Sequence, residues 1–105
     1  TLGGQINNPT FESESCYPHR AMPYLSELQT YWEDHQDPTE LLSSFNEIQE
    51  IIYKAGIRKQ YRNYPTLDFK DWETAYYGDN YPLLKVLKRK YDPKDLFSHE
   101  QTIKL

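Results

Sequence analysis

A stripe of apolar residues with helical spacing occupies the middle of the chain. Its members recur every three or four residues: Leu41, Phe45, Ile48 and Ile52. This spacing places them on one face of a helix. Asp37 can cap the start, Pro38 suits the first helical position, and Gly56 supplies the stop. The pattern predicts a helix over residues 37–56 that packs on a sheet through the buried stripe.

The segment before this helix has the features of strands and loops. Residues 24–32 alternate, imperfectly, between apolar and polar side chains, which is the period of a strand. Gly3-Gly4 is a turn signal, and Pro18 and Pro23 exclude a long helix between them. We expect antiparallel strands and loops over residues 1–36 and another extended segment around Tyr61.

Short helices are predicted towards the C-terminus. Asp68 can cap a helix that ends at Gly78, and a further helix begins near Tyr81-Pro82 and stops before Pro93. We expect one more turn after it, in which Leu96 and Phe97 tuck back onto an apolar surface. The predicted fold class is α+β, with antiparallel strands backed by one long helix, in a single domain of 105 residues.

Composition narrows the class of protein. The net charge of −4 argues against a nucleic-acid partner, and no apolar run reaches the length of a membrane span. Cys16 is the only cysteine, so no internal disulfide can form, which favours a cytoplasmic location. A hydrophobic content of 37 % is low for a self-sufficient domain. The first residues include neither Met nor a leader, so we expect a chain cut from something longer.

Tyrosine is the residue type that offers chemistry. The three histidines are scattered and no cysteine cluster exists, so we expect no metal site. In an extended segment Tyr61 and Asn63 would point to one face and Tyr64 to the other. A phenol beside an amide can act as a base with a hydrogen-bonding clamp. Arg58 and Arg62 are close in sequence and could supply positive charge. The alternative interpretation is a strand of stacked aromatic residues.

Five short motifs occur in a fixed order along nearly the whole chain. They are Gly3-Gly4-x-Ile6; Tyr17-Pro18-His19-Arg20; Tyr61-x-Asn63-Tyr64-Pro65; Ala75-Tyr76-Tyr77-Gly78-x-Asn80-Tyr81; and Lys88-x-Lys90-Tyr91-Asp92-Pro93 with Phe97 and Gln101-x-Ile103. In this order they resemble the C-terminal segment of the berberine bridge enzyme-like FAD-linked oxidases. Thr66 departs from the family pattern, which usually has Asp there.

The resemblance implies a function and roles for particular residues. It implies a C-terminal segment, residues 57–105, preceded by strands and loops of a substrate domain. The whole protein would bind FAD and oxidise an alcohol or amine carbon of a small molecule. Tyr61 would be the candidate catalytic base, and Asn63 and Tyr64 would contact the flavin.

The resemblance also implies a partner, and an alternative function stays open. The N-terminal FAD-binding domain would be the missing partner, so we expect the isolated chain to be inactive and to self-associate through uncovered edges. The alternative is a non-enzymatic protein-interaction module of the same α+β fold.

Overall fold

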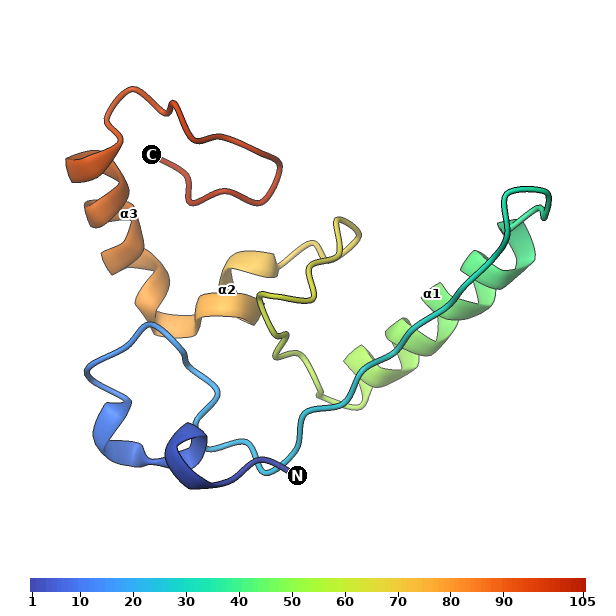
Figure 1. Ribbon diagram of the computed structural model, residues 1–105, viewed down its shortest axis with the longest axis horizontal. Helices are drawn as coiled ribbons and strands as arrows, with labels where there is room; N and C mark the ends of the chain where they lie inside the picture. Colours follow the sequence, from blue (N-terminus) through green and yellow to red (C-terminus); the bar gives the residue numbers. More distant parts are fainter. The chain divides into compact units, whose positions relative to one another are not determined.

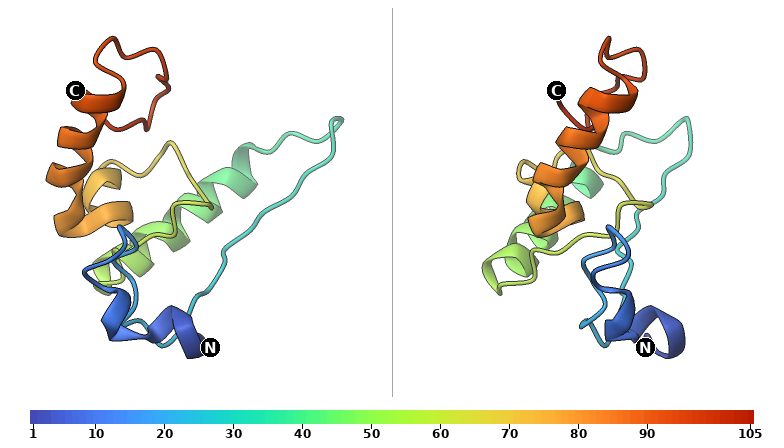
Figure 2. Two further views of the ribbon diagram at one scale, coloured as in Figure 1. Left: turned by 60° about the vertical axis from the view of Figure 1, so that its left-hand side comes forward. Right: turned by 90° about the vertical axis from the view of Figure 1, so that its left-hand side faces the viewer.

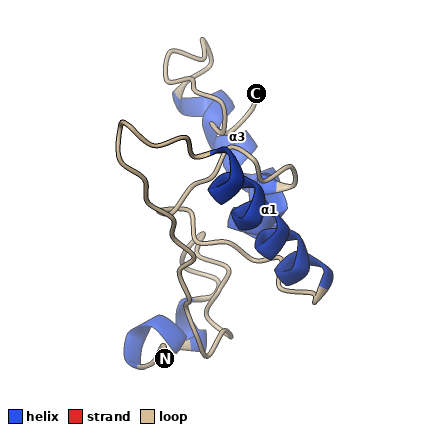
Figure 3. Cartoon of the chain, turned by 90° about the vertical axis from the view of Figure 1, so that its right-hand side faces the viewer, coloured by secondary structure: helices blue, strands red, loops and turns tan.

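The computed structural model describes residues 1–105 and contains helices, turns and loops. The α-helices are α1 (Thr39–Lys54), α2 (Trp72–Tyr77) and α3 (Tyr81–Tyr91). The short 3₁₀ turns η1 (Gly4–Asn7) and η2 (Pro9–Phe11) precede α1, and η3 (Gly78–Asn80) joins α2 to α3. No residue lies in a β-strand (Figure 3). The prediction of an α+β fold with antiparallel strands is therefore wrong.

The segment predicted as a strand shows why. Residues 24–32 form a long stretch without regular secondary structure (Figure 1). A strand exists only when its backbone groups pair with a neighbouring strand. No backbone hydrogen bond pairs residues 24–32 with a neighbouring strand. The backbone bond that comes closest to this segment along the chain joins the Leu2 N–H to the Pro23 carbonyl at 2.8 Å. An alternating pattern alone does not supply the partner.

The chain divides into two compact units. The first consists of Thr1–Pro23 together with Lys59–Leu105, and the second is Tyr24–Arg58. None of the helices is long and apolar enough to span a bilayer.

The second unit contains α1, whose end follows the sequence signal, whereas its start differs: Pro38 is the N-cap and not the first helical residue, and it provides no side-chain capping bond. Asp37 Oδ1 accepts hydrogen bonds from the backbone N–H of Thr39 at 3.0 Å and from its hydroxyl at 2.5 Å. Gly56 adopts φ +90° after the last turn, where a glycine is favoured. No residue of α1 is buried, and Ile48 is 43 % exposed. The expectation that the apolar stripe forms a core within this chain is wrong, because no sheet is present to cover it.

The first unit is organised by α2 and α3. Trp72, Ala75 and Tyr76 lie three and four residues apart on one face of α2 and form the buried apolar core. α3 starts with Pro82 in its first turn and ends at Tyr91, as the sequence predicts. The chain then turns back towards α3 (Figure 2), and the Lys104 N–H donates to the Tyr81 hydroxyl at 3.2 Å.

The N-terminal loop is held by two side chains. Asn7 Nδ2 donates to the carbonyls of Arg20 at 2.6 Å and Met22 at 2.8 Å. The Arg20 guanidinium donates to the carbonyls of Gln5 at 3.2 Å and Ile6 at 3.0 Å. Each of these polar side chains satisfies two backbone carbonyls, which fixes the loop in the absence of regular structure.

Candidate functional site

A tight turn brings together the three residues expected to carry chemistry. The Tyr64 N–H donates to the Tyr61 carbonyl at 2.9 Å, which closes a four-residue turn. Asn63 Nδ2 donates to the Tyr61 hydroxyl at 2.8 Å. The rings of Tyr61 and Tyr64 meet edge to face, with centroids 5.3 Å apart. The segment is a turn and not an extended strand, so Tyr64 lies beside Tyr61 instead of on the opposite face.

Gln60 fixes the turn at its upstream end. Its carbonyl accepts a hydrogen bond from His19 Nε2 at 2.8 Å, and its N–H donates to the Ala75 carbonyl at 3.0 Å. The ring of Tyr17 packs edge to face on both sides, 5.2 Å from His19 and 6.3 Å from Tyr61 between centroids. The residue immediately before Tyr61 is thereby held from two directions.

His19 is buried and electrically neutral in this arrangement. Because the Gln60 carbonyl can only accept, the imidazole proton lies on Nε2. Burial lowers the pKa of His19, the bond to Gln60 opposes this shift, and the positive charge of Lys59 adds to it. His19 Nδ1 is buried without a hydrogen-bond partner. The residue therefore contributes a neutral donor to the Gln60 carbonyl.

A buried polar triangle fixes the turn at its downstream end. The Thr66 N–H donates to the Tyr76 hydroxyl at 3.2 Å, and that hydroxyl donates to Gln101 Oε1 at 3.2 Å. Gln101 Nε2 in turn donates to the Thr66 carbonyl at 2.6 Å. Tyr76 is 1 % exposed and Gln101 5 %. Only backbone groups of Thr66 take part, so the family's usual Asp is not needed for these contacts.

Arg62 does not serve Tyr61. Its Nε donates to the Tyr77 hydroxyl at 2.9 Å, and its guanidinium lies 5.8 Å from the centroid of the Tyr76 ring. Arg58 lies over the ring of Tyr53 within the second unit, at 4.6 Å. Arg62 therefore does not supply the positive charge that was expected at the Tyr61 phenol. It contacts Tyr76 and Tyr77 of α2 instead.

The turn leaves polar and aromatic groups available on the surface. Asn63 is exposed, and Tyr64 is 49 % exposed. An amide oxygen, an amide N–H and an aromatic edge are groups that can contact a planar heterocycle with hydrogen-bonding edges. No group of three or more His, Cys, Asp or Glu side chains is placed to hold a metal ion.

Sequence reasoning missed the residues that hold the turn in place. These residues are His19, Tyr76 and Gln101, and the sequence assigned no contact to any of them. Their partners lie 41, 10 and 35 residues away, respectively. The one available signal was that each of them belongs to a motif of its own. Nothing in local spacing shows that these motifs meet around Tyr61.

Comparison with known proteins identifies the family of this segment. The family model described as "Berberine and berberine like" matches residues 60–104. The FAD-linked oxidoreductase YvdP of Bacillus subtilis is 27 % identical over 103 residues, which cover 96 % of this chain and 22 % of that protein. The chitooligosaccharide oxidase of Gibberella zeae is 30 % identical over 98 residues, covering 88 % of this chain and 20 % of that enzyme.

A plant relative extends this range. The monolignol oxidoreductase AtBBE-like 13 of Arabidopsis thaliana is 28 % identical over 108 residues, again covering 88 % of this chain and 20 % of the relative. No solved structure gave a match. The chain thus spans about a fifth of the length of the curated relatives that it matches.

Proposed function

Because the chain belongs to the berberine bridge enzyme-like family of FAD-linked oxidoreductases, we propose that it forms the C-terminal segment of a larger flavoenzyme. In this proposal the complete protein oxidises an alcohol or amine carbon of a small molecule. The N-terminal FAD-binding domain is its partner in the same polypeptide and supplies most of the flavin site. The 105 residues alone would then be inactive.

The observation that carries the proposal is the placement of the Tyr61–Tyr64 turn. The family match begins at residue 60. Gln60 is also the residue whose carbonyl and N–H are both held, by His19 and Ala75. A turn fixed at both ends positions its side chains for catalysis better than a free loop.

The groups exposed on the turn suit the roles proposed for them. Bound FAD would supply the two-electron acceptor. The Asn63 carboxamide offers both a donor and an acceptor to a flavin edge, and Tyr64 offers a ring face. Asn63 Nδ2 also donates to the Tyr61 oxygen, and such a donor stabilises negative charge that develops there. We assign to Tyr61 the removal of the proton from the substrate hydroxyl or amine.

Substitutions in the full-length protein test these roles. Tyr61→Phe keeps the ring and removes the hydroxyl, so flavin reduction by substrate should slow by about 10²–10⁴-fold. The flavin should stay bound. Asn63→Ala should instead change the flavin spectrum or its retention. Tyr91→Phe is the matched control, because Tyr91 is 73 % exposed on α3.

Two results would contradict the proposal at different levels. Flavin reduction within about threefold of the parent in Tyr61→Phe would remove the catalytic role, since a lost base costs far more. A full-length protein purified without flavin absorbance would remove the oxidoreductase assignment itself.

A further inference from the structure

A short N-terminal segment, residues 17–19, restrains the backbone that leads into Tyr61. His19 is 6 % exposed, and its Nε2 donates to the Gln60 carbonyl at 2.8 Å. That carbonyl belongs to the peptide unit between Gln60 and Tyr61, and a peptide unit is planar, so the bond fixes the orientation of the whole unit. Both ends of the bond lie in the first unit. The restraint therefore comes from a segment that is remote in sequence but belongs to the same compact unit.

Tyr17 restrains the ring of Tyr61. The Tyr17 ring packs edge to face against His19, with centroids 5.2 Å apart, and against Tyr61, with centroids 6.3 Å apart. Tyr64 packs against the Tyr61 ring in the same manner, and Asn63 Nδ2 donates to the Tyr61 hydroxyl. Edge-to-face contacts between aromatic rings are favourable and directional. The Tyr61 side chain is thus held by Tyr17 in addition to its neighbours within the turn.

The end of α2 supports this segment. A Cβ atom placed on Gly78 would lie 3.6 Å from Pro18 Cβ, so the two residues approach closely. Gly78 adopts φ +51° with ψ −135°, a conformation that glycine tolerates better than other residues. The carbonyl of Ala75, also in α2, accepts the Gln60 N–H at 3.0 Å. The segment and Gln60 are consequently fixed against the same helix.

We propose that Tyr17 and His19 are positioning residues for the reaction, and that both act through Tyr61. His19 sets the backbone before Tyr61, and Tyr17 sets the direction of its ring. This inference rests on the proposed function, in which Tyr61 removes the substrate proton. A base works only when its oxygen lies within hydrogen-bond reach of that proton. A misplacement of about 1 Å can slow a reaction by about 10²-fold.

Reduction of the flavin by substrate in the full-length protein tests the role of His19. His19→Leu removes the donor to Gln60 and should slow reduction at saturating substrate by about 10–100-fold. The KM for substrate should change little, because the lost interaction acts on the chemical step. His19→Gln should restore most of the rate, because its side-chain N–H can reach the same carbonyl. A loss of packing alone would not be rescued by this amide.

Two further measurements separate positioning from a general structural role. His19→Leu combined with Tyr61→Phe should be no slower than Tyr61→Phe alone, because positioning matters only while the hydroxyl is present. Tyr17→Leu should also slow reduction, and Tyr17→Phe, which keeps the ring, is its matched control. A fluorinated tyrosine in place of Tyr61 gives a readout that does not depend on activity. Its fluorine NMR signal should shift and broaden in Tyr17→Leu and in His19→Leu, because the ring loses its restraints.

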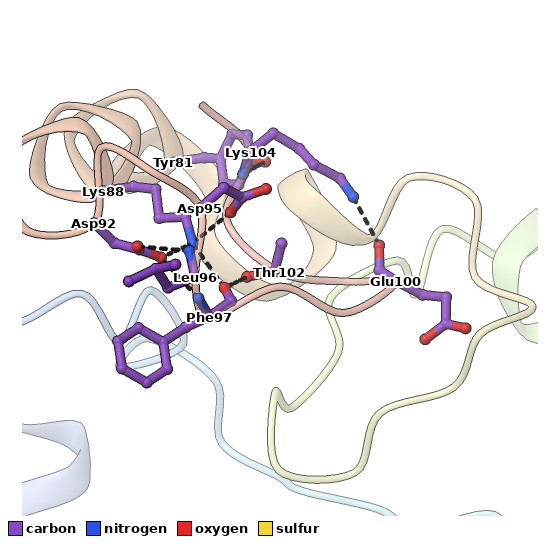
Figure 4. A network of polar contacts seen from close by, with 9 residues as sticks. All are labelled: Tyr81, Lys88, Asp92, Asp95, Leu96, Phe97, Glu100, Thr102 and Lys104. Carbon is purple, nitrogen blue, oxygen red and sulfur yellow. Dashed lines mark hydrogen bonds and ion pairs between the residues drawn. The ribbon is translucent and has the colours of Figure 1, made fainter.

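A second buried network in the same unit provides a control for lost stability. Lys88 Nζ lies 2.5 Å from Asp92 Oδ2 and 2.7 Å from Asp95 Oδ1 (Figure 4). It also donates to the carbonyl of Phe97 at 2.7 Å. The turn fixed in this way leaves Leu96 76 % and Phe97 77 % exposed, so the expectation that both tuck back onto an apolar surface of this chain is wrong. Asp92→Asn removes the charge paired with Lys88 and should lower the thermal midpoint without slowing flavin reduction.

Other results would overturn the inference. Equal rates in His19→Leu and the parent, or equal losses in His19→Leu and His19→Gln, would show that the bond to Gln60 does not position Tyr61. A double variant much slower than Tyr61→Phe alone would give His19 a role that bypasses the Tyr61 hydroxyl. An equal loss of rate in Asp92→Asn would attribute the effect to stability.

Failure of the proposed function is distinguishable from failure of this inference. It would give a wild-type protein that lacks flavin, or a Tyr61→Phe variant that reduces flavin as fast as the parent. In both cases the fluorine signal still reports whether Tyr17 and His19 order the Tyr61 ring. An unchanged signal in Tyr17→Leu and in His19→Leu would refute the positioning itself.

Discussion

Replacing Tyr76 by Phe isolates the polar triangle that holds the downstream end of the turn. The substitution removes one hydroxyl from a side chain that is 1 % exposed and leaves the ring in the core. The Thr66 N–H and Gln101 Oε1 each lose a partner that lay at 3.2 Å. The remaining bond from Gln101 Nε2 to the Thr66 carbonyl at 2.6 Å keeps the two residues together.

The expected loss follows from these two contacts. A hydrogen bond contributes about 0.5–1.5 kcal/mol net, and a buried group left without a partner costs about 1–3 kcal/mol. Tyr76→Phe should therefore reduce the free energy of unfolding by about 2–3 kcal/mol. That is a large share of the stability of a small domain, which is about 5–15 kcal/mol in total.

Urea unfolding followed by far-ultraviolet circular dichroism measures this loss. Tyr91→Phe is the control, because its hydroxyl is on a side chain that is 73 % exposed, and it should change stability by less than about 0.5 kcal/mol. Gln101→Leu combined with Tyr76→Phe should cost less than the sum of the two single changes. A loss below about 0.5 kcal/mol in Tyr76→Phe, typical of a surface site, would refute the triangle as a structural anchor.

Three further predictions concern ionisation and capping. The hydrogen bond from Lys88 lowers the pKa of Asp92, so the stability from this pair is present above about pH 4 and is lost as the pH falls through the lowered pKa; the difference in urea midpoint between wild type and Asp92→Asn should shrink over that range. Burial lowers the pKa of His19, so its contribution is present above about pH 6.5 and declines at lower pH, and an NMR titration of its ring should give a midpoint below 6.5. Asp37→Ala removes the acceptor of two bonds from Thr39, the first residue of α1, and should lower helix content by circular dichroism. Unchanged helicity would show that α1 does not depend on these two bonds.

Local signals predicted the helices, because the features that start and stop a helix lie within a few residues of its ends. Pro82 marks the first turn of α3, and Gly56 with its positive φ marks the end of α1. Asp68 misled the prediction for α2, which begins at Trp72 with no side-chain cap. A residue type that suits a cap therefore does not by itself fix where a helix begins.

The predictions of the strands and of the core were wrong for a different reason. Both kinds of structure need partners that are distant in the sequence. The alternation over residues 24–32 has no neighbouring strand, and Ile48 is 43 % exposed although its spacing is ideal for a core. At the site, the sequence predicted that Tyr61 and Asn63 share a face of an extended segment, but their contact forms within a turn. The bonds from His19 and Gln101 were not predictable, since they span 41 and 35 residues.

The long span between His19 and Gln60 also has a consequence for how the turn forms and for how the chain can vary. The contact joins residues 41 apart in sequence, and the whole second unit lies between them. It therefore needs the closure of a long loop, so it should form late in refolding. The closure cost rises slowly with loop length, by about 0.6 kcal/mol for each doubling. One hydrogen bond contributes about as much. Insertions between residues 24 and 58 should therefore leave the turn at Tyr61 intact. This part of the chain can lengthen while His19 still holds Gln60.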